Sequence, residues 1–154
     1  MTNCEQRTFS NVERIKNEFK DAQSRRHASV AASIIGQIAE RDKFDWKSKD
    51  DVFNNLLSEV EELKEEWESS KSGTQEDKIR RVIDELGDVY FSLAQLCRHL
   101  NINPETVTSQ SSEKFCNRFI EMKRLATKSC LDWDEISHHK RQNLWQQAKK
   151  SLQT

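Results

Sequence analysis

The sequence predicts an all-α protein built as a four- to five-helix bundle, and three observations indicate this fold class. The 154 residues include only 3 glycines and 1 proline, which is fewer turn residues than strands and tight hairpins need. Alternation of apolar and polar residues over strand length is missing, whereas apolar residues recur at helical spacing along much of the chain. The length suits one domain, so we expect residues 1–154 to form a single helical domain.

The first two predicted helices differ in how apolar they are. The first covers residues 11–40, where apolar positions are sparse and the polar residues 24–27 are a candidate break. A loop containing Phe44 and Trp46 follows, and Ser48 or Asp50 is a suitable cap for the second helix. We expect that helix to bury a stripe with i, i+3, i+4, i+7 spacing. The stripe consists of Val52, Phe53, Leu56, Leu57, Val60, Leu63 and Trp67.

The third predicted helix covers residues 75–100, after a polar connector at 69–74, and has a broad apolar face. A face this broad needs neighbours on two sides. Since a closed two-fold dimer is the commonest assembly, we expect a homodimer. The face has one line of residues at Leu86, Val89, Leu93, Leu96 and Leu100, and a wider margin at Val82, Ile83, Tyr90 and Cys97.

The last two helices are predicted from their caps. Asn103 precedes Pro104, and proline is favoured at the first position of a helix because its missing N–H has no partner there. This fourth helix extends to about Lys128, and Ser137 is a suitable cap for a last helix that ends near Leu152. The core face of the fourth helix is expected to include Val107, Phe115, Phe119, Met122 and Leu125.

Composition excludes several classes of protein. A formal net charge of -1 is not typical of nucleic-acid binding, and a mean hydropathy of -0.91 without a long apolar run argues against a membrane span. The first residues are polar and resemble no secretory signal, so we expect a cytoplasmic protein. The cysteines lack C-x-x-C spacing and are interpreted as reduced thiols. They are Cys4, Cys97, Cys116 and Cys130.

Two pairs of carboxylates are the main functional signal. Glu59 with Glu62, and Glu85 with Asp88, are each spaced i, i+3, so both members of a pair share one helix face. Four carboxylates gathered by two packed helices would need a cation, and oxygen ligands suit Mg²⁺ or Mn²⁺. Because charged residues are 33% of the chain, chance spacing on solvated faces is the alternative. The second pair lies among apolar residues, which favours the metal site. Gly87, between its two members, is expected to serve close packing or the approach of a ligand.

Basic and aromatic residues give a second signal. Lys114 and Arg118 are spaced i, i+4 next to aromatic positions, and Trp145 and Lys149 repeat that spacing on the last helix. Such groups suit an anion such as a polyphosphate, and ordinary solvated charge is the alternative. Trp46 suits stacking on a nucleobase or, alternatively, closing the end of the bundle.

Six short motifs follow one another in a characteristic order. They are Phe44-Asp-Trp46, Leu57-Ser-Glu-Val-Glu-Glu-Leu63, Asp84-Glu-Leu-Gly-Asp88, Cys97-Arg-His-Leu100, Glu113-Lys-Phe-Cys-Asn-Arg-Phe119 and the segment from Leu144-Trp145 to Lys149. In this order they resemble the MazG-like nucleotide pyrophosphohydrolases of the all-α NTP pyrophosphatase superfamily. The resemblance covers about residues 37–150 and leaves residues 1–36 as an N-terminal helical extension. Ser58 departs from the pattern, because the family has a glutamate there.

The resemblance implies that the chain converts a nucleoside triphosphate (NTP or dNTP) and water to the monophosphate and pyrophosphate. It implies Mg²⁺, with Mn²⁺ as the alternative, and a homodimer. From the composition we expect no nucleic-acid partner and no membrane partner. A catalytically inactive helical module for interaction or nucleotide binding is the alternative function. The implied metal ligands are Glu59, Glu62, Glu85 and Asp88; the implied catalytic residues are Glu59, Glu62, Lys114 and Arg118; the implied substrate contacts are Trp46, Lys114, Arg118, Trp145 and Lys149.

Overall fold

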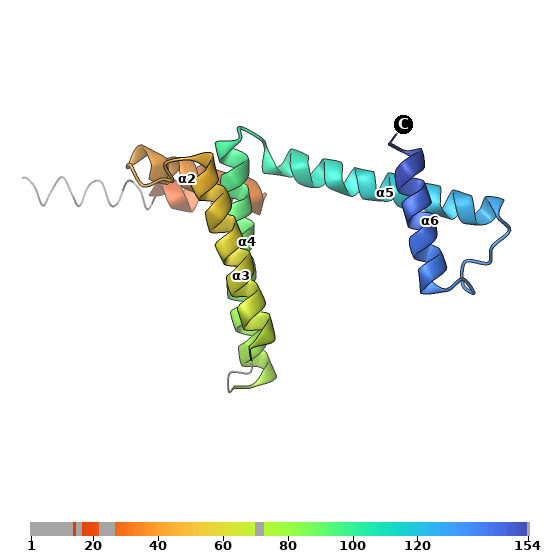
Figure 1. Cartoon of the computed structure of the whole chain (residues 1–154). Helices are drawn as coiled ribbons and strands as arrows, with labels where there is room; N and C mark the ends of the chain where they lie inside the picture. The colour runs from red at the N-terminus through yellow and green to blue at the C-terminus, as the bar shows by residue number, and fades with distance from the viewer. Residues whose placement is uncertain (1–13, 15–16, 22–26, 70–72, 154) are drawn as a thin grey trace, which may run out of the picture. The chain divides into compact units, whose positions relative to one another are not determined.

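The computed structural model describes residues 14, 17–21, 27–69 and 73–153, and no strand is present among them. This confirms the all-α fold class. A helix long and apolar enough to cross a membrane is not found in the described part of the chain. The helices labelled in Figure 1 are α2 (Ala28–Arg41), α3 (Lys49–Glu68), α4 (Gln75–His99), α5 (Pro104–Lys128) and α6 (His138–Ser151).

Side-chain caps set the first residue of most of these helices. The Ser48 hydroxyl oxygen accepts a hydrogen bond from the Asp51 N–H at 3.1 Å, so Ser48 rather than Asp50 caps α3. Thr74 and Asp77 cap each other reciprocally at the start of α4. The predicted caps of the last two helices are confirmed in the same way, by Asn103 before α5 and Ser137 before α6.

Backbone conformation sets two helix boundaries where the sequence indicated them, the start of α2 and the end of α4. His27 has extended dihedral angles (φ −107°, ψ 106°) immediately before α2, which confirms a break at that residue. The neighbouring residues 22–26 lie outside the described residues. After α4, Asn101 adopts a left-handed conformation (φ 56°), and the Ile102 N–H donates to the Cys97 carbonyl at 2.8 Å. This arrangement turns the chain toward α5.

The chain forms two compact units, residues 1–105 and 106–154. In the first unit α4 packs along α3 and also contacts α2 (Figure 1). The second unit consists of most of α5, the following loop and α6. The expectation of one domain stays a prediction, and each unit is described by itself below.

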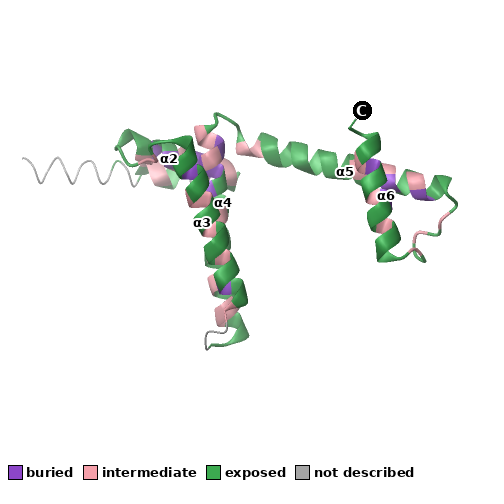
Figure 2. Ribbon diagram, viewed as in Figure 1, coloured by how far each residue is buried: buried purple, intermediate pink, exposed green. Residues whose placement is uncertain are grey.

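The core of the first unit lies where α2 meets the α3–α4 pair (Figure 2). Three of its residues are polar, and two of them tie α2 to α4: the Ser33 hydroxyl donates to the Ala94 carbonyl at 3.2 Å, and the Gln95 amide donates to the Ala32 carbonyl at 2.7 Å. The third, Ser92 on α4, accepts a hydrogen bond from Asn55 on α3. The buried residues here are Ala31, Ser33, Ile38, Val52, Ser92, Ala94, Gln95 and Cys97.

The apolar stripes predicted for α3 and α4 are only partly buried, so the prediction that α3 buries its whole stripe is wrong for the single chain. Tyr90 is 68% exposed and Trp67 64% exposed, because α3 and α4 cover only one side of each other. A Cβ atom at Gly87 would meet no atom within 4 Å, so the close packing expected there does not occur among the described residues. We call the exposed residues the open apolar face: Phe53, Leu57, Val60, Trp67, Ile79, Ile83, Leu86, Tyr90, Phe91 and Leu93.

The second unit has a small core between α5 and α6. Met122 and Ala126 from α5 pack against Leu144 and Ala148 from α6, with Trp133 and other loop residues around them. Phe115 and Phe119 were expected to face the core but are 57% and 41% exposed, because two helices enclose only one side of α5. Their rings stack on each other with centroids 6.4 Å apart.

Candidate metal centre and nucleotide site

Packing of α3 against α4 brings three of the predicted metal ligands together. One carboxylate oxygen each from Glu59, Glu85 and Asp88 lies within 4.8 Å of the others. We call this group the carboxylate triad. Ligands that share one hard cation are each about 2.0–2.6 Å from it, so the oxygens are close to a separation that a single cation can bridge.

The electrostatics of the triad favour a bound cation. Burial, and then the charges of Glu62 and Asp88, raise the pKa of Glu59. Burial and the charges of Glu62, Asp88 and Glu59 raise the pKa of Glu85 in the same direction. A divalent cation would remove this mutual repulsion, so the donor set fits such an ion. The described residues thus present a candidate site for a divalent metal, formed entirely by carboxylate oxygens.

Glu62 lies outside the triad, although its charge contributes to the raised pKa of Glu59 and of Glu85. The Ser58 hydroxyl donates a hydrogen bond to Glu62 at 3.1 Å. The serine that departs from the family pattern is therefore bonded to one of the four predicted ligands. A metal-binding role for Glu62 stays a prediction.

Asn55 links the triad to the body of the first unit, and sequence reasoning did not single it out. Its Nδ2 donates to Glu59 Oε1 at 3.2 Å and to the Ser92 hydroxyl oxygen at 2.9 Å. Asn55 lies one helical turn before Glu59, and that i, i+4 spacing was the available sequence signal. The bond to Ser92 on α4 joins residues 37 positions apart, so the sequence held no comparable signal for it.

A cavity of about 380 Å³ lies beside this link, in the first unit. We call it the Trp46 cavity. Trp46 is half-buried there, whereas Phe44 is 82% exposed. Asn55 belongs both to the cavity lining and to the hydrogen bonds of Glu59. The lining residues are Ile35, Gly36, Ala39, Phe44, Asp45, Trp46, Asn55, Phe91 and Gln95.

An ion-pair network holds the loop that carries Trp46. Arg98, whose side chain is only 7% exposed, contacts Asp45 at 2.5 Å and Glu40 at 2.8 Å. His99 contacts the same Asp45 carboxylate at 3.1 Å, and its ring meets the edge of the Trp46 ring. Burial by itself would raise the pKa of Asp45, but hydrogen bonds from Arg98 and His99 lower it below its ordinary value. The motifs at residues 44–46 and 97–100 are therefore one structural feature.

The wall of the Trp46 cavity depends on a glycine. Gln95 is fully buried, its Nε2 donates to the Ala32 carbonyl, and its Oε1 accepts from Arg98 Nε at 2.8 Å. A Cβ atom at Gly36 would lie 1.8 Å from that Oε1 atom. Only glycine allows α2 to approach Gln95 this closely. A lone glycine in a helix gave no sign of this contact in the sequence.

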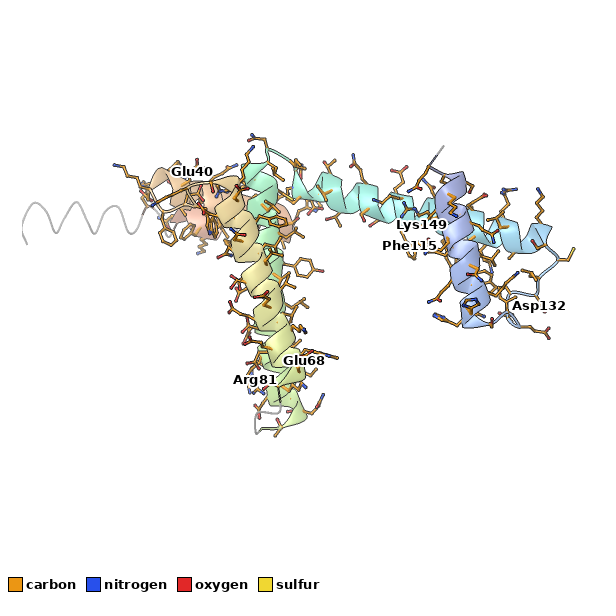
Figure 3. The ribbon with its side chains drawn as sticks, viewed as in Figure 1. Glu40, Glu68, Arg81, Phe115, Asp132 and Lys149 are labelled. Atoms are coloured by element: carbon orange, nitrogen blue, oxygen red, sulfur yellow. The ribbon has the colours of Figure 1, made fainter. Side chains whose placement is uncertain are left out.

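The predicted phosphate contacts lie in the second unit and do not all share one surface. Lys114 and Arg118 line a cavity of about 410 Å³ beside Leu152. Trp145 lines a different cavity of about 650 Å³ and packs on Phe115 with ring centroids 5.2 Å apart. Lys149, half-buried on α6 (Figure 3), lines neither of these two cavities. The structure thus brings Lys114 and Arg118 together, while their role stays a prediction.

Comparison with curated proteins finds similarity to bacterial pyrophosphohydrolases. The chain is 32% identical over 118 residues to the nucleoside triphosphate pyrophosphohydrolase/pyrophosphatase MazG of Thermotoga maritima. This aligned region covers 77% of this chain and 42% of that protein. It is 27% identical over 107 residues to the nucleoside triphosphate pyrophosphohydrolase of Escherichia coli, and this aligned region covers 70% of this chain and 39% of that protein. The chain therefore spans about two fifths of the length of these relatives. No family model matches it.

Proposed function

We propose that this chain, which is homologous to the MazG nucleoside triphosphate pyrophosphohydrolases over most of its length, hydrolyses NTPs to NMP and pyrophosphate with a divalent cation. The carboxylate triad is the observation that carries the proposal, because it gathers negative charge that a bound cation would stabilise. The names of the relatives support the reaction type.

The proposed cation is Mg²⁺, with Mn²⁺ as the alternative, because every candidate ligand is a carboxylate oxygen. Glu59, Glu85 and Asp88 would hold it. Glu62 is close enough for its charge to raise the pKa of Glu59 and of Glu85. When bound, such an ion neutralises phosphate charge and lowers the pKa of a coordinated water.

The protein's own side chains would place the reactants. Glu59 is held by Asn55 and has a raised pKa, so it suits accepting a proton from the attacking water. Lys114, Arg118 and Lys149 would bind phosphate oxygens and stabilise the charge that develops on the leaving pyrophosphate.

The nucleobase would occupy the Trp46 cavity. Its walls are mostly apolar and aromatic, and it is joined to the triad through Asn55. A base held there would leave its phosphates directed toward the carboxylates. Trp145 is proposed as a second aromatic contact to the substrate.

A homodimer is part of the proposal. The open apolar face on α3 and α4 is larger than isolated surface residues would explain, and a second copy offers the same face for self-complementary packing.

Product analysis tests this function. The protein is incubated with a panel of NTPs and Mg²⁺, and the products are separated by ion-exchange chromatography. We expect NMP and pyrophosphate in equal amounts, and no products when EDTA is present. Release of NDP and orthophosphate would contradict the assigned cleavage. Nucleotide binding without any product would instead favour the inactive binding module.

A further inference from the structure

We infer that Asn55 selects the nucleobase, and that it favours bases with an exocyclic amino group over bases with a keto oxygen at the same position. This inference rests on the proposed function, because it takes the Trp46 cavity as the site of the base. Asn55 is the residue through which that cavity and the carboxylate triad are joined.

The first step concerns the orientation of the Asn55 carboxamide. An ionised Glu59 carboxylate only accepts hydrogen bonds, so the carboxamide has to present Nδ2 to it. The same Nδ2 also donates to the Ser92 hydroxyl oxygen at 2.9 Å. Two bonds to one nitrogen fix the carboxamide and leave Oδ1 as its acceptor. Within the described residues, that Oδ1 atom accepts no hydrogen bond.

The second step eliminates the other polar groups of the cavity lining. The Asp45 carboxylate is engaged by Arg98 and His99. The Gln95 amide uses its nitrogen for the Ala32 carbonyl and its oxygen for Arg98. The Trp46 indole N–H is a donor. Cytosine and adenine both have ring-nitrogen acceptors for such a donor, so Trp46 is compatible with amino bases. Among the side-chain acceptors of the lining, Asn55 Oδ1 is the one for which the described residues supply no donor.

The third step is the chemistry of the bases. Cytosine and adenine present an amino donor where uracil and hypoxanthine present a carbonyl acceptor. With that position of the ring against Asn55 Oδ1, an amino group would satisfy the oxygen, whereas a carbonyl would oppose it. Only a shift of the ring would bring the neighbouring ring N–H of a keto base to this oxygen. A site that offers one polar partner rejects the analogue that leaves it unpaired. We expect a preference of at least about tenfold in kcat/KM for amino over keto substrates.

Asn55 is also a positioning residue for Glu59. The carboxamide that would contact the base is the one that holds this proposed metal ligand. Its replacement should lower kcat for every nucleotide, and only the ratio between nucleotides reports recognition of the base. The two effects can be separated by the choice of substituent.

The experiment measures kcat/KM for two matched pairs of substrates, CTP with UTP and ATP with ITP. In Asn55→Leu the preference for CTP and ATP should fall to less than about twofold, together with a lower kcat for all four. Asn55→Asp keeps an acceptor oxygen but repels Glu59, so the preference should survive while turnover falls. Asn54→Leu is the matched control, since Asn54 is the exposed neighbour on α3 and should keep both properties.

Equal turnover of CTP and UTP by the wild type would overturn the inference, and so would an unchanged preference in Asn55→Leu with a normal thermal melt. Titration of CTP and UTP in the presence of Mg²⁺ separates this result from failure of the proposed function. If no nucleotide releases pyrophosphate but CTP binds more tightly than UTP, the proposed hydrolysis is contradicted, whereas recognition of the base by Asn55 is supported. Equal or undetectable binding of both would overturn the assignment of Asn55.

Discussion

At the scale of single residues, the carboxylate triad makes folding depend on pH. The pKa of Glu59 is raised in the folded chain by burial and by neighbouring charges. Its contribution to stability is therefore fully present below the ordinary value of 4.5 and is lost as the pH rises through the higher folded value. A divalent cation should reverse this loss, because it stabilises the ionised form.

Substitution of Glu59 tests that dependence. In EDTA, Glu59→Gln should melt about 2–4 °C higher than the wild type at neutral pH, and the difference should vanish at pH 4. Addition of Mg²⁺ should raise the melting temperature of the wild type more than that of the variant. Thermal melts followed by circular dichroism across this pH range provide the measurement. A wild type that is the more stable protein in EDTA at neutral pH would count against a repulsive triad.

Lys114 and Arg118 give a second prediction at this scale. Either Lys114→Ala or Arg118→Ala should weaken NTP binding at least about tenfold, because the lost contacts would be to phosphate oxygens. NMP binding should change less than about twofold. Calorimetric titrations of both ligands measure the two affinities. Arg124→Ala is the control, since Arg124 lies on the same helix but pairs with Glu121. Equal losses for NTP and NMP would remove the phosphate role.

At the scale of helices, two glycines with opposite surroundings test the packing of α2 on α4. Gly36→Ala places a methyl group 1.8 Å from Gln95 Oε1, so it should lower the free energy of unfolding by at least about 2 kcal/mol. Gly87→Ala meets nothing within 4 Å and should raise it by up to about 1 kcal/mol, because alanine favours a helix. Urea denaturation of the two variants makes the comparison, and similar stability of both would show that α2 does not pack closely on Gln95.

Helix boundaries were predictable from the sequence because they depend on local chemistry. Ser48, Asn103 with Pro104, and Ser137 act within a few residues of themselves, and the structure confirms each of them. Burial was less predictable, because the spacing of apolar residues does not say how many sides of a helix will have neighbours. This is why Tyr90 and Phe115 are exposed in the single chain.

In the candidate site, too, local features were predictable from the sequence and long-range contacts were not. Glu59, Glu85 and Asp88 were found from spacing because each pair lies on one helix face, and helix packing then brings them together. The hydrogen bond between Asn55 and Ser92 and the ion pair between Asp45 and Arg98 join residues 37 and 53 positions apart. Nothing in the sequence near either partner indicates such contacts.

At the scale of the whole molecule, the open apolar face predicts assembly. Light scattering during size exclusion should give a mass of about twice 18.1 kDa at micromolar concentration. Ile83→Glu, which places a charge on the exposed face of α4, should yield the single chain and lose turnover. Lys140→Glu, at an exposed position of α6 that is not part of the open apolar face, is the charge-changing control and should remain a dimer. An active wild-type species of 18.1 kDa would show that one chain completes its own site.

The most direct test of the central claim is the rate of pyrophosphate release from an NTP as the Mg²⁺ concentration is varied, for the wild type and for Glu85→Gln. The carboxylate triad predicts release that saturates with Mg²⁺, equals NMP formation, and falls at least about 100-fold in Glu85→Gln while the fold is retained. Release that needs no divalent cation, or that is unchanged in Glu85→Gln, would contradict a metal-dependent pyrophosphohydrolase centred on these carboxylates.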